Sequence, residues 1–325
     1  MIWYTLDWRA LMKRTLTLIM TMILCLGLMG CGAAATESGE GALEIVTTVF
    51  PAYDFCRQVA GERARVTLLV PPGAESHSFE PTAQDMIRIQ NAALFVYNGG
   101  ESEAWVEELL AGQDAPANML CMLDLVDALE EEIKEGMQEI FEEEEDDDEV
   151  EYDEHVWTSP RNAILLCQAI RDALSALDPE GKETYYVNCT AYTEQLTALD
   201  EAFRQVVAEA KRDTVIFADR FPVRYFVEEY GLDYFAAFPG CAEDTEPSAR
   251  TVAFLIDRVR EEDIPAVFYI EFSNEKMADV ICEDTSCQKL LFHSCHNVTA
   301  AELRQGVSYA ELMAGNVEAL KEALW

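Results

Sequence analysis

The sequence predicts an α/β protein of two similar lobes, each built on a parallel sheet, joined by one long α-helix. From Leu43 onward, short β-rich runs alternate with amphipathic helical runs, a pattern typical of parallel sheets with crossover helices. The alternation stops for a helical stretch from Lys182 to Lys211 and starts again at Thr214. With 325 residues, 50% of them hydrophobic, the chain is long enough to bury two cores of medium size.

Hydrophobic periodicity and cap signals place the elements of the first lobe. Its three strands are expected at Glu44–Phe50, Arg65–Val70 and Ala93–Tyr97. One helix is expected over Ala52–Ala60, and a second begins after Thr82, whose spacing from Asp85 resembles a capping box. A further helical pattern starts near Asp127 and runs into eight consecutive acidic residues, Glu142 to Glu149.

The middle of the chain is expected to be helical. Ser159 and Pro160 are an N-cap and first-turn pair that opens a helix through about Ala176. The stretch Lys182–Lys211 keeps helical apolar spacing for some eight turns, far longer than the usual globular helix of about three. Such a helix is long enough to connect two lobes.

The second lobe repeats the alternation. Strands are expected at Thr214–Ala218, Ala266–Phe272 and Lys289–Phe292, and helices at Val223–Glu229, Ala249–Glu261, Glu275–Ile281 and Tyr309–Leu324. The predicted organisation is therefore a first lobe over 43–180 with an acidic loop at 141–154, a linking helix over 181–211, and a second lobe over 212–325.

The N-terminus has the pattern of an export signal. Lys13 and Arg14 precede an apolar run, Leu16–Leu28, that is too short to span a bilayer, which predicts a signal peptide over residues 1–30, or 12–30 if Met12 is the start. The tetrapeptide ending at Cys31 resembles a bacterial lipobox, which implies a lipidated cysteine. Residues 31–42 would then tether the protein to the outer face of the cell membrane.

Charge and cysteine content narrow the class of protein. With 23 basic and 61 acidic residues the net charge is −38, which disfavours nucleic-acid binding and favours attraction of cations. Of ten cysteines, Cys25 and Cys31 belong to the signal and the anchor. Export permits a disulfide between Cys282 and Cys287, whereas Cys121 and Cys167 sit in apolar stretches and are expected to be buried thiols. The absence of a CxxC pair disfavours a structural zinc knuckle.

The four histidines of the chain all fall outside the predicted helices and strands. His77 follows a predicted strand, His155 precedes the Ser159 helix start, and His293 and His296 follow another strand. Open α/β sheets bind ligands at the carboxyl ends of their strands. We therefore predict a metal site in the loops between the lobes.

Four segments resemble the solute-binding lipoproteins of zinc and manganese ABC importers. They are Thr47–Asp54, Gly73–Pro81, Asp153–Trp157 and Tyr225–Leu232, and the likeness covers nearly the whole mature chain. The combination of G-x-E-x-H-x-F-E-P with D-E-H-x-W is specific. The resemblance implies two lobes joined by a rigid helix, with the metal held between them.

The resemblance carries two metal ligands over directly, onto His77 and His155. The third family position, a histidine or glutamate, falls on Arg220, which cannot bind a cation. Asp219, just past the predicted strand end, is the candidate in its place. Its alternative role is an ion-pair partner for Arg220 or Arg224.

The fourth ligand is expected after the last strand. Relatives supply an aspartate or glutamate there, where this chain offers His296, with His293 as the alternative. Glu271 resembles a family glutamate that supports the ligands, and Glu80 in the Gly73–Pro81 segment is assigned the same kind of role.

This ligand set predicts a receptor rather than a catalyst. Imidazoles with one carboxylate make a closed four-coordinate site suited to Zn²⁺, whereas Mn²⁺ prefers more oxygen ligands. The expected function is capture of zinc, with manganese or iron as alternatives, and its delivery to an ABC permease and its ATPase. The acidic loop either raises the local metal concentration or is a solvated, repulsive tract.

Two other functions compete with a transport receptor. A zinc hydrolase is disfavoured because the mature chain has no HExxH, GxSxG or complete SxxK motif set. A metal-binding surface adhesin that shares the fold is the second rival, because fold alone does not determine function.

Overall fold

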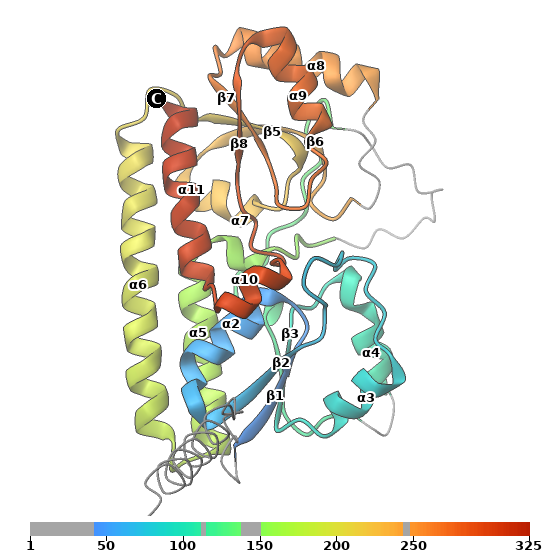
Figure 1. Ribbon diagram of the computed structural model, residues 1–325, viewed down its shortest axis with the longest axis vertical. Helices are drawn as coiled ribbons and strands as arrows, with labels where there is room; N and C mark the ends of the chain where they lie inside the picture. The colour runs from blue at the N-terminus through green and yellow to red at the C-terminus, as the bar shows by residue number, and fades with distance from the viewer. Residues whose placement is uncertain (1–41, 112–114, 138–150, 243–247) are drawn as a thin grey trace, which may run out of the picture. The chain divides into compact units, whose positions relative to one another are not determined.

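Four parallel strands form the sheet of the first lobe in the computed structural model, which describes residues 42–111, 115–137, 151–242 and 248–325 (Figure 1). The strands are β1 (Leu43–Thr47), β2 (Ala64–Leu68), β3 (Leu94–Tyr97) and β4 (Met119–Cys121), in the order β2-β1-β3-β4. Ile45 of β1 pairs with Val66 of β2 and with Leu94 of β3. The order of the strands changes direction between β1 and β3. In open α/β sheets, ligands bind at the carboxyl ends of the two strands that flank such a point.

The helices of the first lobe are α2 (Phe50–Ala60), α3 (Ala83–Gln90), α4 (Ala104–Ala111) and α5 (Pro160–Leu177). The predicted capping box is confirmed, since Thr82 and Asp85 exchange side-chain and backbone hydrogen bonds at the start of α3. The predicted start of α5 is confirmed as well: the Ser159 side chain accepts a hydrogen bond from the Asn162 backbone N–H. Short 3₁₀ turns occur at Gly61–Arg63, Glu101–Glu103, Leu123–Leu125 and Val156–Thr158, the last of which is η4.

The second lobe has a parallel sheet of the same form, with the order β6-β5-β7-β8. Its strands are β5 (Thr214–Arg220), β6 (Asp233–Phe238), β7 (Ala266–Tyr269) and β8 (Gln288–Leu291). Its helices are α7 (Arg224–Tyr230), α8 (Ala249–Glu261), α9 (Lys276–Thr285), α10 (Ala300–Gln305) and α11 (Tyr309–Leu324). The predicted pair of α/β lobes is therefore confirmed.

The long helix α6 (Lys182–Ala208) joins the two lobes and runs beside α5 and α11 (Figure 1). Its buried face repeats at helical spacing, with Tyr185, Cys189, Tyr192, Leu196, Leu199 and Phe203 pointing into the protein. These residues belong to one continuous hydrophobic core that also contains Ile45 of the first sheet and Phe217 of the second. The helix therefore stabilises both lobes through a shared core.

The helix predicted from Asp127 is wrong for the described residues up to 137. The chain there is irregular and ends in a turn, and Glu130 forms an antiparallel bridge with Tyr152. The Asp153 N–H also donates a hydrogen bond of 2.8 Å to the Leu129 carbonyl. Pairing with the returning chain therefore overrides the local helical pattern, and it holds the segment that leads into His155.

Several boundaries differ from the predictions. Strand β5 continues to Arg220, so Asp219 lies inside the strand rather than past its end. Four short elements, α4, β4, β6 and α10, have no counterpart among the predicted ones. Polar residues at a strand end resemble a loop when only the local pattern is considered.

Some predictions fall on residues that the structure does not describe. The signal peptide, Cys31 and the acidic run Glu142–Glu149 all lie outside the described ranges. Within those ranges, no helix combines the length and the hydrophobicity needed to cross a bilayer.

The thiols of the described residues are all free. The Cys282 and Cys287 sulfurs lie 3.0 Å apart without a disulfide between them. Cys167 is buried as predicted, whereas Cys121 is only half-buried.

Candidate metal centre

Three imidazoles from three separate loops converge on one point. His77 follows β2, His155 immediately precedes η4, and His296 follows β8. One nitrogen from each ring lies within 4.8 Å of one nitrogen from each of the others. The ring centroids are 5.5 Å apart for His77 and His155, 4.8 Å for His77 and His296, and 5.2 Å for His155 and His296.

The three histidines line a pocket of about 250 Å³. Its walls also include Glu75, Arg220, Gly240, Glu271 and Phe272, among other residues. These come from the loops at the carboxyl ends of strands in both sheets, where parallel α/β proteins bind their ligands. The pocket is therefore the candidate functional site.

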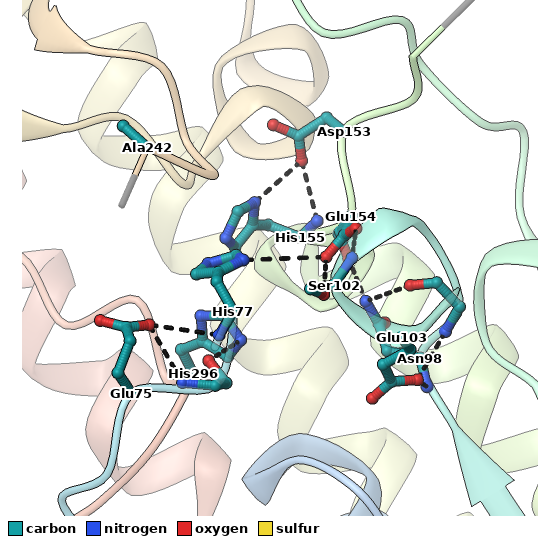
Figure 2. A network of polar contacts seen from close by, with 12 residues as sticks. Glu75, His77, Asn98, Ser102, Glu103, Asp153, Glu154, His155, Ala242 and His296 are labelled. Carbon is teal, nitrogen blue, oxygen red and sulfur yellow. Dashed lines mark hydrogen bonds and ion pairs between the residues drawn. The ribbon is translucent and has the colours of Figure 1, made fainter. Parts of the chain in front are cut away.

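His155 is fully buried and is held by the neighbouring Asp153 (Figure 2). One carboxylate oxygen, Oδ1, accepts a hydrogen bond of 2.8 Å from the His155 backbone N–H and lies 3.3 Å from the ring Nδ1. A carboxylate at Nδ1 keeps the proton on that nitrogen and leaves the lone pair on Nε2, which has no hydrogen-bond partner. Burial opposes a charge on this ring, but the carboxylates of Asp153, Glu154 and Glu131 together outweigh it and raise the pKa of His155.

Gly240, two residues past β6, makes room for the His155 ring. A Cβ atom at this position would lie 3.1 Å from the ring Cε1 and 3.0 Å from the Phe221 carbonyl oxygen. Both contacts are tighter than ordinary packing allows, so a side chain here would displace the imidazole.

His296 is oriented by polar groups on both sides. Its backbone N–H donates a hydrogen bond of 3.1 Å to Glu271, and its ring Nε2 lies 2.7 Å from the Ser76 hydroxyl. Glu271 also accepts hydrogen bonds from the backbone N–H and hydroxyl of Ser294. Burial, followed by the nearness of His77 and His155, lowers the pKa of His296 well below its usual range. The ring is therefore neutral and has a lone pair that can bind a metal.

The His77 side chain is 4% exposed. Burial and the neighbouring His155 lower the pKa of His77 to about 3, so it too is neutral at physiological pH. Its Nδ1 has no hydrogen-bond partner and faces Glu154 Oε2 at 3.9 Å (Figure 2). A second group of possible metal-binding atoms consists of His77, Glu154 and Cys241, again within 4.8 Å of one another.

Two predicted ligands lie outside this convergence. Asp219 is buried, but its carboxylate accepts hydrogen bonds from the Arg220 backbone N–H at 2.8 Å and the Ile270 N–H at 3.4 Å, and it belongs to neither group of possible ligands. His293 uses Nδ1 to accept a hydrogen bond of 2.9 Å from the Cys295 N–H. The structure thus brings His296, and not His293, to His77 and His155.

The two predicted supporting glutamates have different positions. Glu271 holds the loop that carries Ser294 and His296. Glu80 is exposed to solvent and belongs to neither group of possible ligands.

Arg220, at the family ligand position, lines the pocket and pairs with a carboxylate instead. Its guanidinium donates a hydrogen bond of 3.0 Å to Glu75, which lies in the loop that also carries His77. Their side chains are 15% and 43% exposed, so the pair is expected to contribute at most about 1 kcal/mol to stability. It nevertheless joins the end of β5 to a loop of the first lobe.

Sequence reasoning missed Asp153, Glu154, Ser76 and Cys241. Asp153 and Glu154 were visible, because they flank His155 in the D-E-H-x-W segment. Cys241 could have been found if β6 had been predicted, since the cysteine would then have followed a strand end.

A family model and individual relatives both match this chain along most of its length. The family model described as "Zinc-uptake complex component A periplasmic" matches residues 45–323. The zinc-binding lipoprotein AdcA of Streptococcus pneumoniae is 33% identical over 317 residues, which cover 95% of this chain and 61% of AdcA. The chain thus spans about three fifths of the length of this relative.

A second relative matches along nearly its full length. The high-affinity zinc uptake system protein ZnuA of Bacillus subtilis is 29% identical over 90% of this chain and 92% of its own. Among solved structures, the Zn(II)-bound ZnuA-like domain of Streptococcus pneumoniae AdcA superposes with a TM-score of 0.72 at 33% identity. That superposition covers 87% of this chain and 99% of the domain.

Proposed function

The chain belongs to the family of the periplasmic component A of zinc-uptake complexes, and we propose on that premise that it is an extracytoplasmic receptor for zinc. It captures the ion at His77, His155 and His296 and delivers it to an importer. The observation that carries this proposal is the convergence of three imidazoles from both lobes within 4.8 Å.

The donor chemistry favours zinc over other cargo. Zinc is bound in proteins by imidazole nitrogen at roughly 2.0–2.1 Å and is usually four-coordinate. Manganese prefers oxygen donors, so manganese or iron is the alternative rather than the first choice. Two nitrogens support a bound cation directly: Nδ1 of His77 and Nε2 of His155 are buried without a hydrogen-bond partner. Buried polar atoms are rarely left unpaired, and a cation would satisfy both.

We propose binding rather than catalysis. A zinc ion with three protein ligands can activate water, and a carboxylate free to act as general base would favour a hydrolase. The nearby carboxylates are engaged with protein donors: Asp153 with His155, Glu154 with Ser102, and Glu271 with Ser294. These hydrogen bonds orient the loops instead of leaving a base free for water.

Release of the cargo follows from the origin of the ligands. His77 and His155 belong to the first lobe and His296 to the second, in the proposed division 43–180, 181–211 and 212–325. A small separation of the lobes would remove one ligand from the other two. We propose that docking on an ABC permease, driven by its ATPase, causes this separation.

The proposed location follows from the N-terminal pattern. Cleavage before Cys31 and lipidation of that cysteine would hold the receptor on the outer face of the bacterial membrane. Replacing Cys31 with alanine should release the protein into the medium or periplasm, as measured by fractionation and immunoblotting. Retention in the membrane fraction would show that the anchor lies elsewhere.

Calorimetric titration of the metal-depleted protein with zinc tests the site. His155→Ala and His296→Ala should each weaken zinc binding by more than the roughly 10–100-fold loss typical of residues that only support a ligand. The matched control is His293→Asn, which keeps an acceptor for the Cys295 N–H and should bind zinc like the parent. Unchanged affinity in His155→Ala, or equal losses at positions 293 and 296, would overturn the assignment.

A growth experiment separates transport from adhesion. A strain without the gene should grow poorly in zinc-depleted medium and recover when the intact gene, but not the His155→Ala form, is restored. Normal growth of the deletion strain under zinc depletion, together with lost attachment to host surfaces, would favour the adhesin alternative.

A further inference from the structure

A second set of metal-binding side chains lies beside the three-histidine cluster. One donor atom of each of His77, Glu154 and Cys241 lies within 4.8 Å of the other two. His77 follows β2, Glu154 precedes η4, and Cys241 follows β6, so both lobes contribute. Glu154 is 3% exposed and Cys241 is half-buried, which places the set inside the protein.

His77 carries an unpaired nitrogen on the side of Glu154. Its Nδ1 is buried, has no hydrogen-bond partner, and lies 3.9 Å from Glu154 Oε2 (Figure 2). This separation is too long for a hydrogen bond. It is short enough for one cation to bridge both atoms, because each bond from zinc to nitrogen or oxygen is roughly 2.1 Å long.

The Glu154 carboxylate is already held in place. The Ser102 backbone N–H donates a hydrogen bond of 2.8 Å to Oε1, and the Ser102 hydroxyl donates to Oε2. Gly100 has φ of 90°, and a Cβ atom there would lie 2.4 Å from Oε1, so glycine is needed beside this carboxylate. Carboxylates that bind metals are usually hydrogen-bonded in this way.

The second set supplies negative charge directly to a bound cation, which the three imidazoles do not. Around the three imidazoles the negative charge comes from carboxylates such as Asp153, which lies against the His155 ring, and the guanidinium of Arg220 lines the same pocket. Glu154 supplies one negative charge. Cys241 supplies the other when its sulfur bonds to the metal and its proton passes to solvent. Buried charge is costly unless it is compensated.

We propose that His77, Glu154 and Cys241 form a second metal position for a thiophilic divalent ion such as zinc or cadmium. This inference rests on the proposed function in sharing His77. A neutral imidazole has one lone pair, so His77 serves one position at a time and the two positions are alternatives. The receptor thus holds one ion at either of two positions. One position has only nitrogen ligands, and the other has nitrogen, oxygen and sulfur ligands.

Cobalt(II) shows which position is occupied. A cobalt–thiolate bond gives a charge-transfer absorption in the near ultraviolet, whereas bonds from cobalt to imidazole or carboxylate do not. The full-length protein is reduced, depleted of metal and titrated with cobalt. In His296→Ala the three-histidine cluster is lost, so the thiolate band should grow to a plateau at one equivalent. Adding Cys241→Ser to this variant should abolish the band.

Two further variants keep the test sharp. Adding Cys282→Ser to His296→Ala changes a thiol of the Cys282 and Cys287 pair, which belongs to neither group of possible ligands, and the band should remain. If His296→Ala does not fold, as judged by circular dichroism, His155→Ala replaces it, since it also removes the cluster while leaving the contact between His296 and Ser76.

The outcomes separate the two proposals. A folded variant that lacks the thiolate band, or a band that survives Cys241→Ser, overturns the second position while the zinc receptor stands. Calorimetry in the Cys241→Ser background removes the second position from the comparison. No loss of zinc affinity there on adding His296→Ala or His155→Ala overturns the three-histidine site, whatever the cobalt spectrum shows.

Discussion

At the scale of single residues, the orientation of one imidazole depends on one carboxylate. Asp153 Oδ1 holds both the backbone N–H and the ring Nδ1 of His155. A histidine that binds a metal usually donates its other ring N–H to such an acceptor, which fixes the ring and its tautomer. In the proposed site Asp153 would therefore act on the metal through His155.

Replacing Asp153 with asparagine removes the negative charge that favours this arrangement. We expect zinc affinity to fall by about tenfold or more, as is typical when a supporting acceptor of a metal-bound histidine is changed. Calorimetric titration measures the loss. Asp172→Asn, at an exposed ion pair with Arg171, should bind zinc like the parent. Equal affinity in the two variants would contradict the role given to Asp153.

Ionisation of the buried Glu103 lowers the free energy of unfolding, by an amount that depends on pH. Its carboxylate accepts hydrogen bonds from the Asn98 and Gly99 backbone N–H groups, yet burial raises its pKa to about 7, above the ordinary glutamate value of 4.5. An acid with a raised pKa in the folded state stays protonated up to that pKa. Its folded-state penalty therefore grows as the pH rises from about 4.5 to about 7 and is complete above that window.

Glu103→Gln should remove this penalty. The free energy of unfolding of the metal-free variant should exceed that of the parent at pH 8, by up to about 3 kcal/mol, and the two should converge near pH 4. Urea denaturation at the two pH values measures the difference. Glu62→Gln, at an exposed position, should show no such dependence. A variant that is less stable than the parent at pH 8 would rule this account out.

At the scale of elements, the helix start at Ser159 supports the site. Helix α5 begins right after the segment that carries His155 and Trp157, and the Ser159 side chain accepts the Asn162 N–H as an N-cap. The Trp157 indole donates a hydrogen bond of 2.8 Å to the Ser294 carbonyl, which links this start to the loop of His296.

Ser159→Ala should lower the free energy of unfolding by about 1 kcal/mol, because the first turn loses its side-chain acceptor. Urea denaturation measures the change. Ser175→Ala is the matched control: its hydroxyl donates to the Arg171 carbonyl inside the same helix, and alanine is the better helix former there. A loss of stability no greater than that of the control would show that the cap is dispensable.

The elements that local pattern predicted best were long or clearly capped. Helix α8 and helix α11 have the predicted bounds, and the capping box of Thr82 and Asp85 opens α3. The helix predicted from Asp127 was wrong because the conformation of this segment depends on pairing with residues beyond the acidic run. Strand β6 is a short run between two turns, which carries little local signal.

At the scale of the whole described unit, Asp54 joins three helices. It is fully buried in α2 and accepts hydrogen bonds from the Tyr192 hydroxyl of α6 at 2.7 Å and from the Tyr309 backbone N–H at the start of α11 at 2.9 Å. Arg57 balances its charge at 2.6 Å. The first lobe, the linking helix and the second lobe thus share one carboxylate.

Asp54→Ala should lower the free energy of unfolding by about 3–5 kcal/mol, because it leaves several buried donors and one charge without their partner. Urea denaturation measures the loss, and the zinc stoichiometry of the folded variant should remain that of the parent. Asp279→Ala, at an exposed ion pair with Lys289, should change stability by less than about 1 kcal/mol. Similar small losses in both variants would remove Asp54 as the link.

The sequence by itself determined the two α/β lobes, the long helix and the kind of donor, because periodicity, caps and short motifs are local properties of the chain. It also singled out His77 and His155. Only the tertiary structure decided that His296 and not His293 meets them, that Asp219 bonds to backbone within its own lobe, and that Glu154 and Cys241 lie beside His77. Those placements depend on how loops from two sheets pack together across a shared core. The local pattern of the sequence does not specify distances between residues that are far apart in the chain.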